Sequence, residues 1–268
     1  MIIMLTENRR SLVRATLTLI MTAAVLLPGP SPADPPSEAV RVCSTSITQP
    51  LAAAIVNHYS AAPTAFDLAN AHDSRYPCHV RFMARLVSET DGTHGVVGYD
   101  AIVAVVHPAN RLSRITRDQV RGIFAGTIKN WSELGGSPGA IVAKLPDETS
   151  DEAQLLTTTL LSGLKIASGV ERLPSSSEVV RYISSRRDSI GLVALSQADP
   201  AKVLPLGDSV PNPLTIADHS YPLSIAIVAI TVTSPDDAPD AKALRLIKYA
   251  RSPEAQSIVV DKGLVGLK

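Results

Sequence analysis

The stretch "YDAIVAVVHPANRLSRITRDQVRGIFAGTIKNWSELGG", residues 99–136, contains the clearest structural signals in the chain. It begins with an apolar, β-branched run that ends at Pro108, a pattern typical of a strand buried on both faces. Thr116 and Gln119 then have capping-box spacing, which predicts the start of a helix, and Gly126 predicts its end. A buried strand that leads into a capped helix indicates an α/β fold.

The flanking segments repeat this alternation of strands and helices. Residues 40–62 predict a short strand, a hydroxyl-rich turn and a helix, and residues 176–195 predict a helix, a turn and a strand that begins near Ile190. Residues 221–232 predict a further strand, and two closing helices follow within 240–263. The whole pattern therefore predicts an α/β architecture.

Composition limits the class of protein. The chain has 268 residues, of which 45% are hydrophobic, which is enough for one large domain or two modest ones. Its formal net charge is zero. Because nucleic-acid binders normally present a basic face, we expect no nucleic-acid partner.

The N-terminus predicts an export signal over residues 1–33. Three arginines precede the apolar run 17–27, and "PGPSPA" then offers a small residue for cleavage after Ala33. The alternative is an uncleaved membrane anchor. We expect residues 34–39 to form a linker, and the protein to be secreted across the inner membrane into the periplasm or the extracellular space.

Two cysteines, Cys43 and Cys78, follow the predicted cleavage point. In an oxidising compartment such a pair predicts a disulfide, and the alternative is two buried free thiols. Neither cysteine has metal-site spacing to a histidine, so we expect no metal site.

Recognisable catalytic motifs are missing from the sequence. It contains no Gly-x-Ser-x-Gly elbow, no His-Glu-x-x-His and no phosphate-binding P-loop, and its six histidines are scattered. The pattern alone leaves a secreted α/β binding protein or an enzyme without a recognisable motif, and of these two we expect a binding protein without cofactors and not an enzyme.

Residues 99–136 resemble the signature region of the PstS-like phosphate-binding proteins, the substrate-binding proteins of ABC transporters. The resemblance lies in the "DAI" strand, the "HPAN" turn, the "DQVRGIFAGTIKNW" helix and the "GG" exit, in that order. It extends to "DSIGLVAL", "DHSYPLSIAIVAITV" and the closing "KYARSPEAQSIVVDKGLVGL". The N-terminal part of the chain matches the family more loosely, and the first of the two lobes that the family has is shortened here.

The resemblance implies a type II periplasmic-binding-protein fold with a ligand cleft between two α/β lobes. Lobe 1 would contain residues 40–104 and 221–268, and lobe 2 residues 105–220. The implied function is to bind phosphate or a related small oxyanion or solute for ABC-type import, as a monomer that meets a permease. The alternative is a non-transporting sensor or interaction protein with a degenerate anion site.

The resemblance also implies which side chains bind the ligand. The first hydroxyl-rich loop would contribute Ser44, Thr45, Ser46 and Thr48, and a later turn would contribute Asp73, Ser74 and Arg75. Each has an ordinary alternative, because Ser and Thr often cap helices and Asp is common in turns.

The stretch "VAKLPDETSDEAQLL", residues 142–156, departs from the family pattern. It stands where the family has R-x-x-x-S-G-T, which puts Lys144 at the arginine and Thr149 and Ser150 in the anion-binding element. Glu148 would oppose phosphate, since two unit charges about 4 Å apart repel by roughly 4 kcal/mol at an effective dielectric constant of about 20. Shifting the alignment brings Asp151 and Glu152 there instead.

Two interpretations of this acidic stretch remain open. Asp147, Thr149 or Ser150 would cap the helix that follows, so that the chain satisfies its own N–H groups. Alternatively the ligand has changed to a cationic or neutral polar solute, with Glu148 or Asp151 as its acceptor.

Overall fold

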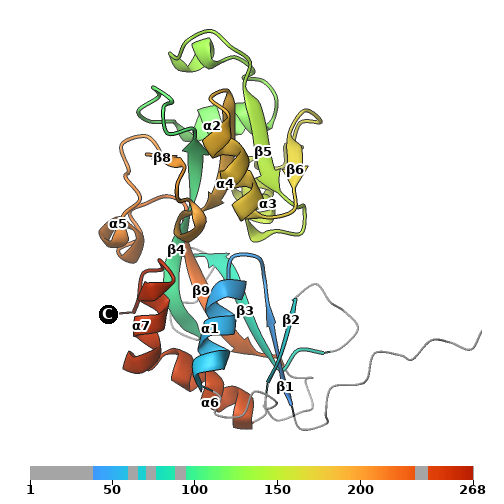
Figure 1. Cartoon of the computed structure of the whole chain (residues 1–268), viewed down its shortest axis with the longest axis vertical. Helices are drawn as coiled ribbons and strands as arrows, with labels where there is room; N and C mark the ends of the chain where they lie inside the picture. The colour runs from blue at the N-terminus through green and yellow to red at the C-terminus, as the bar shows by residue number, and fades with distance from the viewer. Residues whose placement is uncertain (1–38, 60–65, 71–76, 88–94, 233–240, 268) are drawn as a thin grey trace, which may run out of the picture. The chain divides into compact units, whose positions relative to one another are not determined.

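A computed structural model of the chain describes residues 39–59, 66–70, 77–87, 95–232 and 241–267 (Figure 1). The predicted export signal and all of the predicted linker except Ala39 lie outside these residues. The strands are β1 (Val40–Ser44), β2 (Phe66–Asn70), β3 (Val80–Leu86), β4 (Val96–Val106), β5 (Val142–Pro146), β6 (Glu171–Leu173), β7 (Ser189–Ala194), β8 (Lys202–Leu204) and β9 (Ser224–Thr231). The helices are α1 (Gln49–Tyr59), α2 (Arg117–Phe124), α3 (Asp151–Leu155), α4 (Ser176–Ser185), α5 (Pro213–Ala217), α6 (Ala241–Ala250) and α7 (Pro253–Asp261).

Within the described residues the strands form one continuous sheet, in the order β2-β1-β3-β9-β4-β7-β5-β6 with β8 also paired to β4. The long strand β4 connects its two parts. Up to Ala101 it pairs antiparallel with β9, and from Ile102 onward it pairs antiparallel with β7 and β8. We call the strands β1, β2, β3 and β9 with the start of β4 the first half-sheet, and β5 to β8 with the end of β4 the second half-sheet.

The predicted division into two lobes matches this arrangement in outline but stays a prediction. The partners of β4 change between Ala101 and Ile102, which lies within the predicted first segment of lobe 1, residues 40–104.

The strand and helix signals of residues 99–136 are confirmed. β4 is buried almost throughout, as its β-branched composition predicts. Thr116 caps α2, with both hydrogen bonds of the capping box present, and Gly126 follows the helix with a φ of 79°. Trp131 packs inward, and its indole N–H donates to the backbone oxygen of Asp188 over 3.2 Å.

The other predicted elements are also present. β1 leads through a turn into α1, α4 precedes β7, and β9 lies within residues 221–232. Ser252 caps α7 and Pro253 is its first residue. In Figure 1, α1 packs against α6 and α7 beside the first half-sheet, while α4 packs against β5 and β7. A large hydrophobic core extends through both half-sheets.

Cys43 at the end of β1 and Cys78 ahead of β3 form a disulfide, with 5.8 Å between their Cα atoms. Their separation of 35 residues means that the bond closes a long loop. In the chain-entropy description such a loop contributes roughly 4 kcal/mol to stability. Among the described helices none is long and apolar enough to cross a membrane.

Candidate functional site

Three strand-to-helix turns come together at the carboxyl ends of parallel strands. β1 runs into α1 through residues 44–48, which we call the neutral turn. β5 runs into α3 through residues 147–152, which we call the acidic segment and which includes the first turn of the helix. β6 runs into α4 through Pro174 and Ser175. Ligands of open α/β sheets bind outside such strand ends, because backbone N–H groups of the following helices point there.

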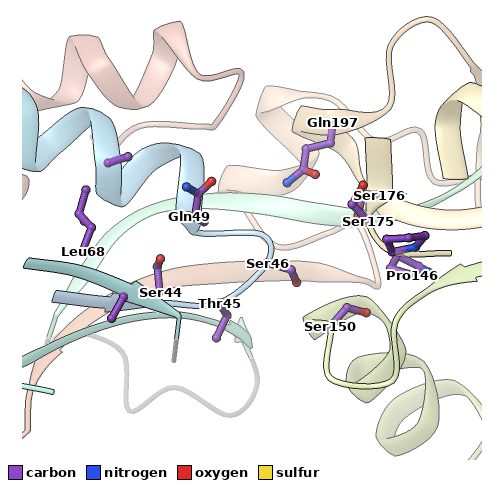
Figure 2. Close-up of a pocket in the computed structure, with 13 residues that line it drawn as sticks. Ser44, Thr45, Ser46, Gln49, Leu68, Pro146, Ser150, Ser175, Ser176 and Gln197 are labelled. Carbon is purple, nitrogen blue, oxygen red and sulfur yellow. The ribbon is translucent and has the colours of Figure 1, made fainter. Parts of the chain in front are cut away.

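A pocket of about 370 Å³ lies between these turns. Figure 2 shows side chains of the neutral turn and α1 on one side of it, and those of Pro146, Ser150, Ser175 and Ser176 on the other. The pocket is lined by Ser44, Thr45, Ser46, Gln49, Ala53, Leu68, Ala69, Pro146, Ser150, Pro174, Ser175, Ser176 and Gln197. Both half-sheets therefore contribute side chains to one site.

None of the described residues that line the pocket carries a charge. Hydroxyl groups, two amides and a few apolar side chains form its walls. The amide nitrogen of Gln197 is buried and has no hydrogen-bond partner among the described residues. Because a buried N–H without an acceptor is costly, an acceptor on a bound solute would stabilise this side chain.

The acidic segment reaches across to the neutral turn. The Asp151 carboxylate accepts a hydrogen bond from the backbone N–H of Ile47 over 3.2 Å. In return, the backbone N–H of Asp151 donates to Ser46 Oγ over 3.1 Å. Ser150 caps α3 by accepting from the backbone N–H of Ala153, so Ser150 is the N-cap among the predicted alternatives. The carboxylate of Asp151 thus contacts the other half-sheet.

Glu152 is fully buried between the turns. Its carboxylate accepts from Ser46 Oγ over 3.2 Å and from Ser176 Oγ in a short hydrogen bond. Burial raises the pKa of Glu152 above its usual range, and the neighbouring charge of Asp151 adds to the rise, while the serine hydrogen bonds oppose it. Glu152 therefore lies at the contact of neutral turn, acidic segment and α4, with a carboxyl group that holds its proton more readily than usual.

Asp100 is a second buried carboxyl group, on β4 close to the point where the strand changes partners. It accepts from Ser196 Oγ over 2.6 Å and from the backbone N–H of Ala101 over 2.8 Å. Burial, with a small contribution from the nearby charge of Glu152, raises the pKa of Asp100 to about 7 against these hydrogen bonds. Asp100 and Glu152 are thus electrostatically coupled inside the protein.

The predicted ligand residues separate into four groups. Ser44, Thr45, Ser46 and Ser150 line the pocket. Thr48 is buried behind it and donates to the backbone oxygen of Phe82 over 3.0 Å, so it shapes the neutral turn.

Thr149 is exposed, and its hydroxyl donates a hydrogen bond to Asp147. The side chain of Lys144 is 1% exposed, and its ammonium pairs with Glu171 and lies over the Tyr182 ring. Neither is among the residues that line the pocket. Asp73, Ser74 and Arg75 lie outside the described residues.

The sequence interpretation missed several residues of the pocket and its surroundings. Ser175 and Ser176 carry the same signal as the neutral turn, a run of hydroxyl side chains between a strand and a helix. Asp100 was visible as a lone carboxylate in an otherwise apolar strand. Gln49 directly follows the neutral turn, whereas Gln197 comes from a distant part of the chain. Neither glutamine stands in a local pattern that would mark it as a pocket residue. No group of three or more His, Cys, Asp or Glu among the described residues could hold a metal ion.

Comparison with curated proteins finds two phosphate-binding proteins. The chain is 31% identical over 168 residues to phosphate-binding protein PstS of Bacillus subtilis, covering 61% of this chain and 54% of that protein. It is 25% identical over 187 residues to phosphate-binding protein PstS of Borreliella burgdorferi, covering 65% of each. The chain therefore spans less than two thirds of the length of these relatives.

Solved structures share the fold. A phosphate ABC transporter substrate-binding protein from Clostridium perfringens, described as putative and with bound phosphate, superposes with a TM-score of 0.72 at 18% identity, covering 86% of this chain and 100% of that one. An ABC-type phosphate transport receptor from Vibrio cholerae gives a TM-score of 0.71 at 18% identity, covering 85% and 100%. At this identity the likeness concerns the fold, which is the predicted periplasmic-binding-protein type.

A family model described as "PBP superfamily domain" matches residues 84–254, which is more than half of the chain. The match includes the whole of residues 99–136, where the resemblance is densest in the sequence. Together with the curated relatives, it establishes that the chain belongs to the periplasmic-binding-protein superfamily as a PstS-like member.

Proposed function

We propose that this chain is an extracytoplasmic solute-binding protein that holds a small polar solute in the pocket between its half-sheets and delivers it to an ABC-type permease. The observation that carries the proposal is the pocket itself, lined by hydroxyl groups from turns of both half-sheets. A site built from two sides suits a protein that closes around its ligand. The family supports the same function, since its relatives bear the names of phosphate-binding proteins.

Phosphate or a related oxyanion is the first solute to test, because the relatives are named for it. The neutral hydroxyl donors of the pocket suit an oxyanion. The proposal includes export by the segment 1–33, action as a monomer, and no catalysis. Two lobes, 40–104 with 221–268 and 105–220, would move about β4 and β9 as the pocket closes.

The test is a calorimetric titration of the purified protein with inorganic phosphate, after unfolding and refolding to remove any solute bound during expression. Sulfate, amino acids and sugars follow in a thermal-unfolding panel. We expect at least one small solute to bind in a one-to-one ratio and raise the melting temperature, because ligands that bind the folded state stabilise it. If no anion, amino acid or sugar changes the melting temperature, the transport function is wrong.

A second function, a sensor or interaction protein with a degenerate anion site, is favoured by one observation. Asp151 and Glu152 already accept hydrogen bonds from the neutral turn that a bound anion would accept. Such a protein would keep the fold and the pocket without responding to small solutes, so the same panel separates the two functions.

A further inference from the structure

We propose that the carboxylates of Asp151 and Glu152, buried beside the pocket, occupy hydrogen-bond donors that a bound oxyanion would use, so that the protein excludes oxyanions while these groups are ionised. The proposal rests on the proposed function, because it names the residues that decide which class of solute the same pocket accepts.

The geometry of the hydrogen bonds carries the first step. The backbone N–H of Ile47, just ahead of α1, donates to Asp151 Oδ2 over 3.2 Å. The hydroxyl of Ser46 donates to Glu152 Oε2 over 3.2 Å, and that of Ser176 donates to Glu152 Oε1. Donors from both half-sheets thus converge on two carboxylates, as they would on an oxyanion at a strand-to-helix turn.

The position of these donors carries the second step. Ser46 and Ser176 line the pocket, and Ile47 follows Ser46 directly in the neutral turn. Figure 2 shows Ser46 near the acidic side of the pocket, where Ser150 precedes the two carboxylates. An oxyanion that entered would have to compete with the protein's own carboxylates for the same hydroxyl and N–H groups.

Electrostatics carries the third step, because a third negative charge would lack a compensating cation. No described residue of the pocket lining is cationic. Among the elements that pack against α3, β5 carries Lys144, which pairs with Glu171, and β7 carries no charged residue. On β3, Arg81 and Arg85 are cationic, but neither is among the residues that line the pocket. A repelling charge about 4 Å away weakens anion binding by on the order of a thousandfold at an effective dielectric constant of about 20.

Protonation should relieve this exclusion. Burial raises the pKa of Glu152, and the neighbouring charge of Asp151 on the same helix adds to the rise. Asp100 on β4 is electrostatically coupled to Glu152. A protonated Glu152 would lose its negative charge and could donate a hydrogen bond to an oxyanion. While both carboxylates are ionised, the pocket accordingly favours a solute that is uncharged or cationic, because the carboxylates can accept hydrogen bonds from its N–H or O–H groups.

The direct test compares phosphate affinity at pH 8 in the wild-type protein, Glu152→Gln, Asp151→Asn and the matched control Glu148→Gln. Glu148 lies in the same acidic segment but is exposed, so its substitution changes the net charge equally without touching the pocket. We expect Glu152→Gln and Asp151→Asn each to bind phosphate at least about tenfold more tightly than the wild type, and Glu148→Gln to match the wild type. Unchanged affinity in both folded pocket variants, or an equal gain in Glu148→Gln, overturns the proposal.

A second measurement needs no substitution to fold correctly. Sulfate stays a dianion between pH 8 and pH 5, so any change in its affinity over this range reports on the protein. We expect the wild-type protein to bind sulfate at least about tenfold more tightly at pH 5 than at pH 8, since protonation removes the repelling charge, and Glu152→Gln to depend less on pH. Constant affinity, or the same pH dependence in both proteins, contradicts the proposal.

The outcomes also separate this proposal from the proposed function. If the wild-type protein binds a neutral solute but the pocket variants gain no phosphate affinity, the exclusion mechanism alone fails. Tight phosphate binding by the wild-type protein at pH 8 likewise rejects the mechanism and leaves transport standing. If no solute binds the wild type while Glu152→Gln gains phosphate, transport fails and the mechanism stands.

Discussion

The neutral turn and the acidic segment hold equivalent places in the fold and have opposite chemistry. Each follows a parallel strand, each precedes a helix, and both end at the pocket. The neutral turn presents hydroxyl and N–H donors, whereas the acidic segment presents carboxylate acceptors to those same donors. The comparison shows that topology sets where a site forms, while the side chains at the turns set which solutes it accepts.

The two turns are also anchored differently. β1, which leads into the neutral turn, is tied to the segment before β3 by the disulfide at Cys43. β5, which leads into the acidic segment, is held by the pairing of buried Lys144 with Glu171 and by the Tyr182 ring 4.1 Å from its ammonium. A covalent bond thus anchors the strand before the neutral turn, and an ion pair with a buried lysine anchors the strand before the acidic segment.

The largest effect should come from Asp100, whose pKa is raised in part by the charge of Glu152 in the acidic segment. Its folded pKa of about 7 lies above the usual 3.8, so folding favours the protonated form. This contribution to stability is complete below about pH 4 and is lost as the pH rises through 7. At about 1.4 kcal/mol per pKa unit, the difference between 3.8 and about 7 amounts to about 4 kcal/mol.

Urea unfolding of the wild-type protein and Asp100→Asn from pH 4 to pH 8 measures this effect. We expect the stability of the wild type, relative to the variant, to fall by up to about 4 kcal/mol over this range. Parallel curves for the two proteins would mean that Asp100 titrates in the folded state as it does in the unfolded chain.

A smaller effect is expected at the anchor of the acidic segment. Glu171→Gln removes the charged partner of Lys144, whose side chain is 1% exposed. We expect a loss of about 2 kcal/mol, less than for a fully buried pair, because Glu171 is 68% exposed and water already reaches it. The measurement is urea unfolding at pH 7.

Glu178→Gln is the matched control for this prediction. It makes the same change of acid to amide in the pair with Arg181, whose side chain is exposed, and should leave stability nearly unchanged. Equal losses of stability in the two variants would show that burial of Lys144 does not strengthen its ion pair.

The smallest effect concerns the caps of the helices at the pocket. Ser150 is buried and accepts from the backbone N–H of Ala153 over 3.1 Å, so Ser150→Ala should cost about 1 kcal/mol. Ser175 caps α4 in the same way but is exposed, and water can replace its hydroxyl. Thermal unfolding of Ser150→Ala and Ser175→Ala should therefore give the larger loss for Ser150, and a larger loss for Ser175 would contradict this ranking.

Much of the fold could be predicted because its signals are local. The capping box at Thr116, the apolar run of β4 and the serine–proline start of α7 each report their element within a few neighbouring residues. The order of the strands could not be predicted in this way. It depends on β9 returning between β3 and β4, which is a long-range pairing without a local signal.

The candidate site could be predicted in part. The resemblance to the PstS-like family implied Ser44, Thr45 and Ser46, which line the pocket, and the capping signal made Ser150 one of several possible caps. Lys144 looked like a ligand cation in the alignment, yet its ammonium is paired with Glu171 away from the pocket lining. The direction of a side chain at the end of a strand depends on the neighbouring strand, which the alignment does not contain.

The sequence by itself determined the α/β class, the family and the presence of an acidic segment where the resemblance implies an anion-binding element. Only the tertiary structure decided what that acidic segment contacts. Asp151 and Glu152 lie more than one hundred residues from Ile47 and Ser46 along the chain, and the folded sheet brings them within hydrogen-bond distance. Local patterns determine elements because backbone hydrogen bonds are local, whereas the partner of a buried carboxylate depends on which distant segments pack together.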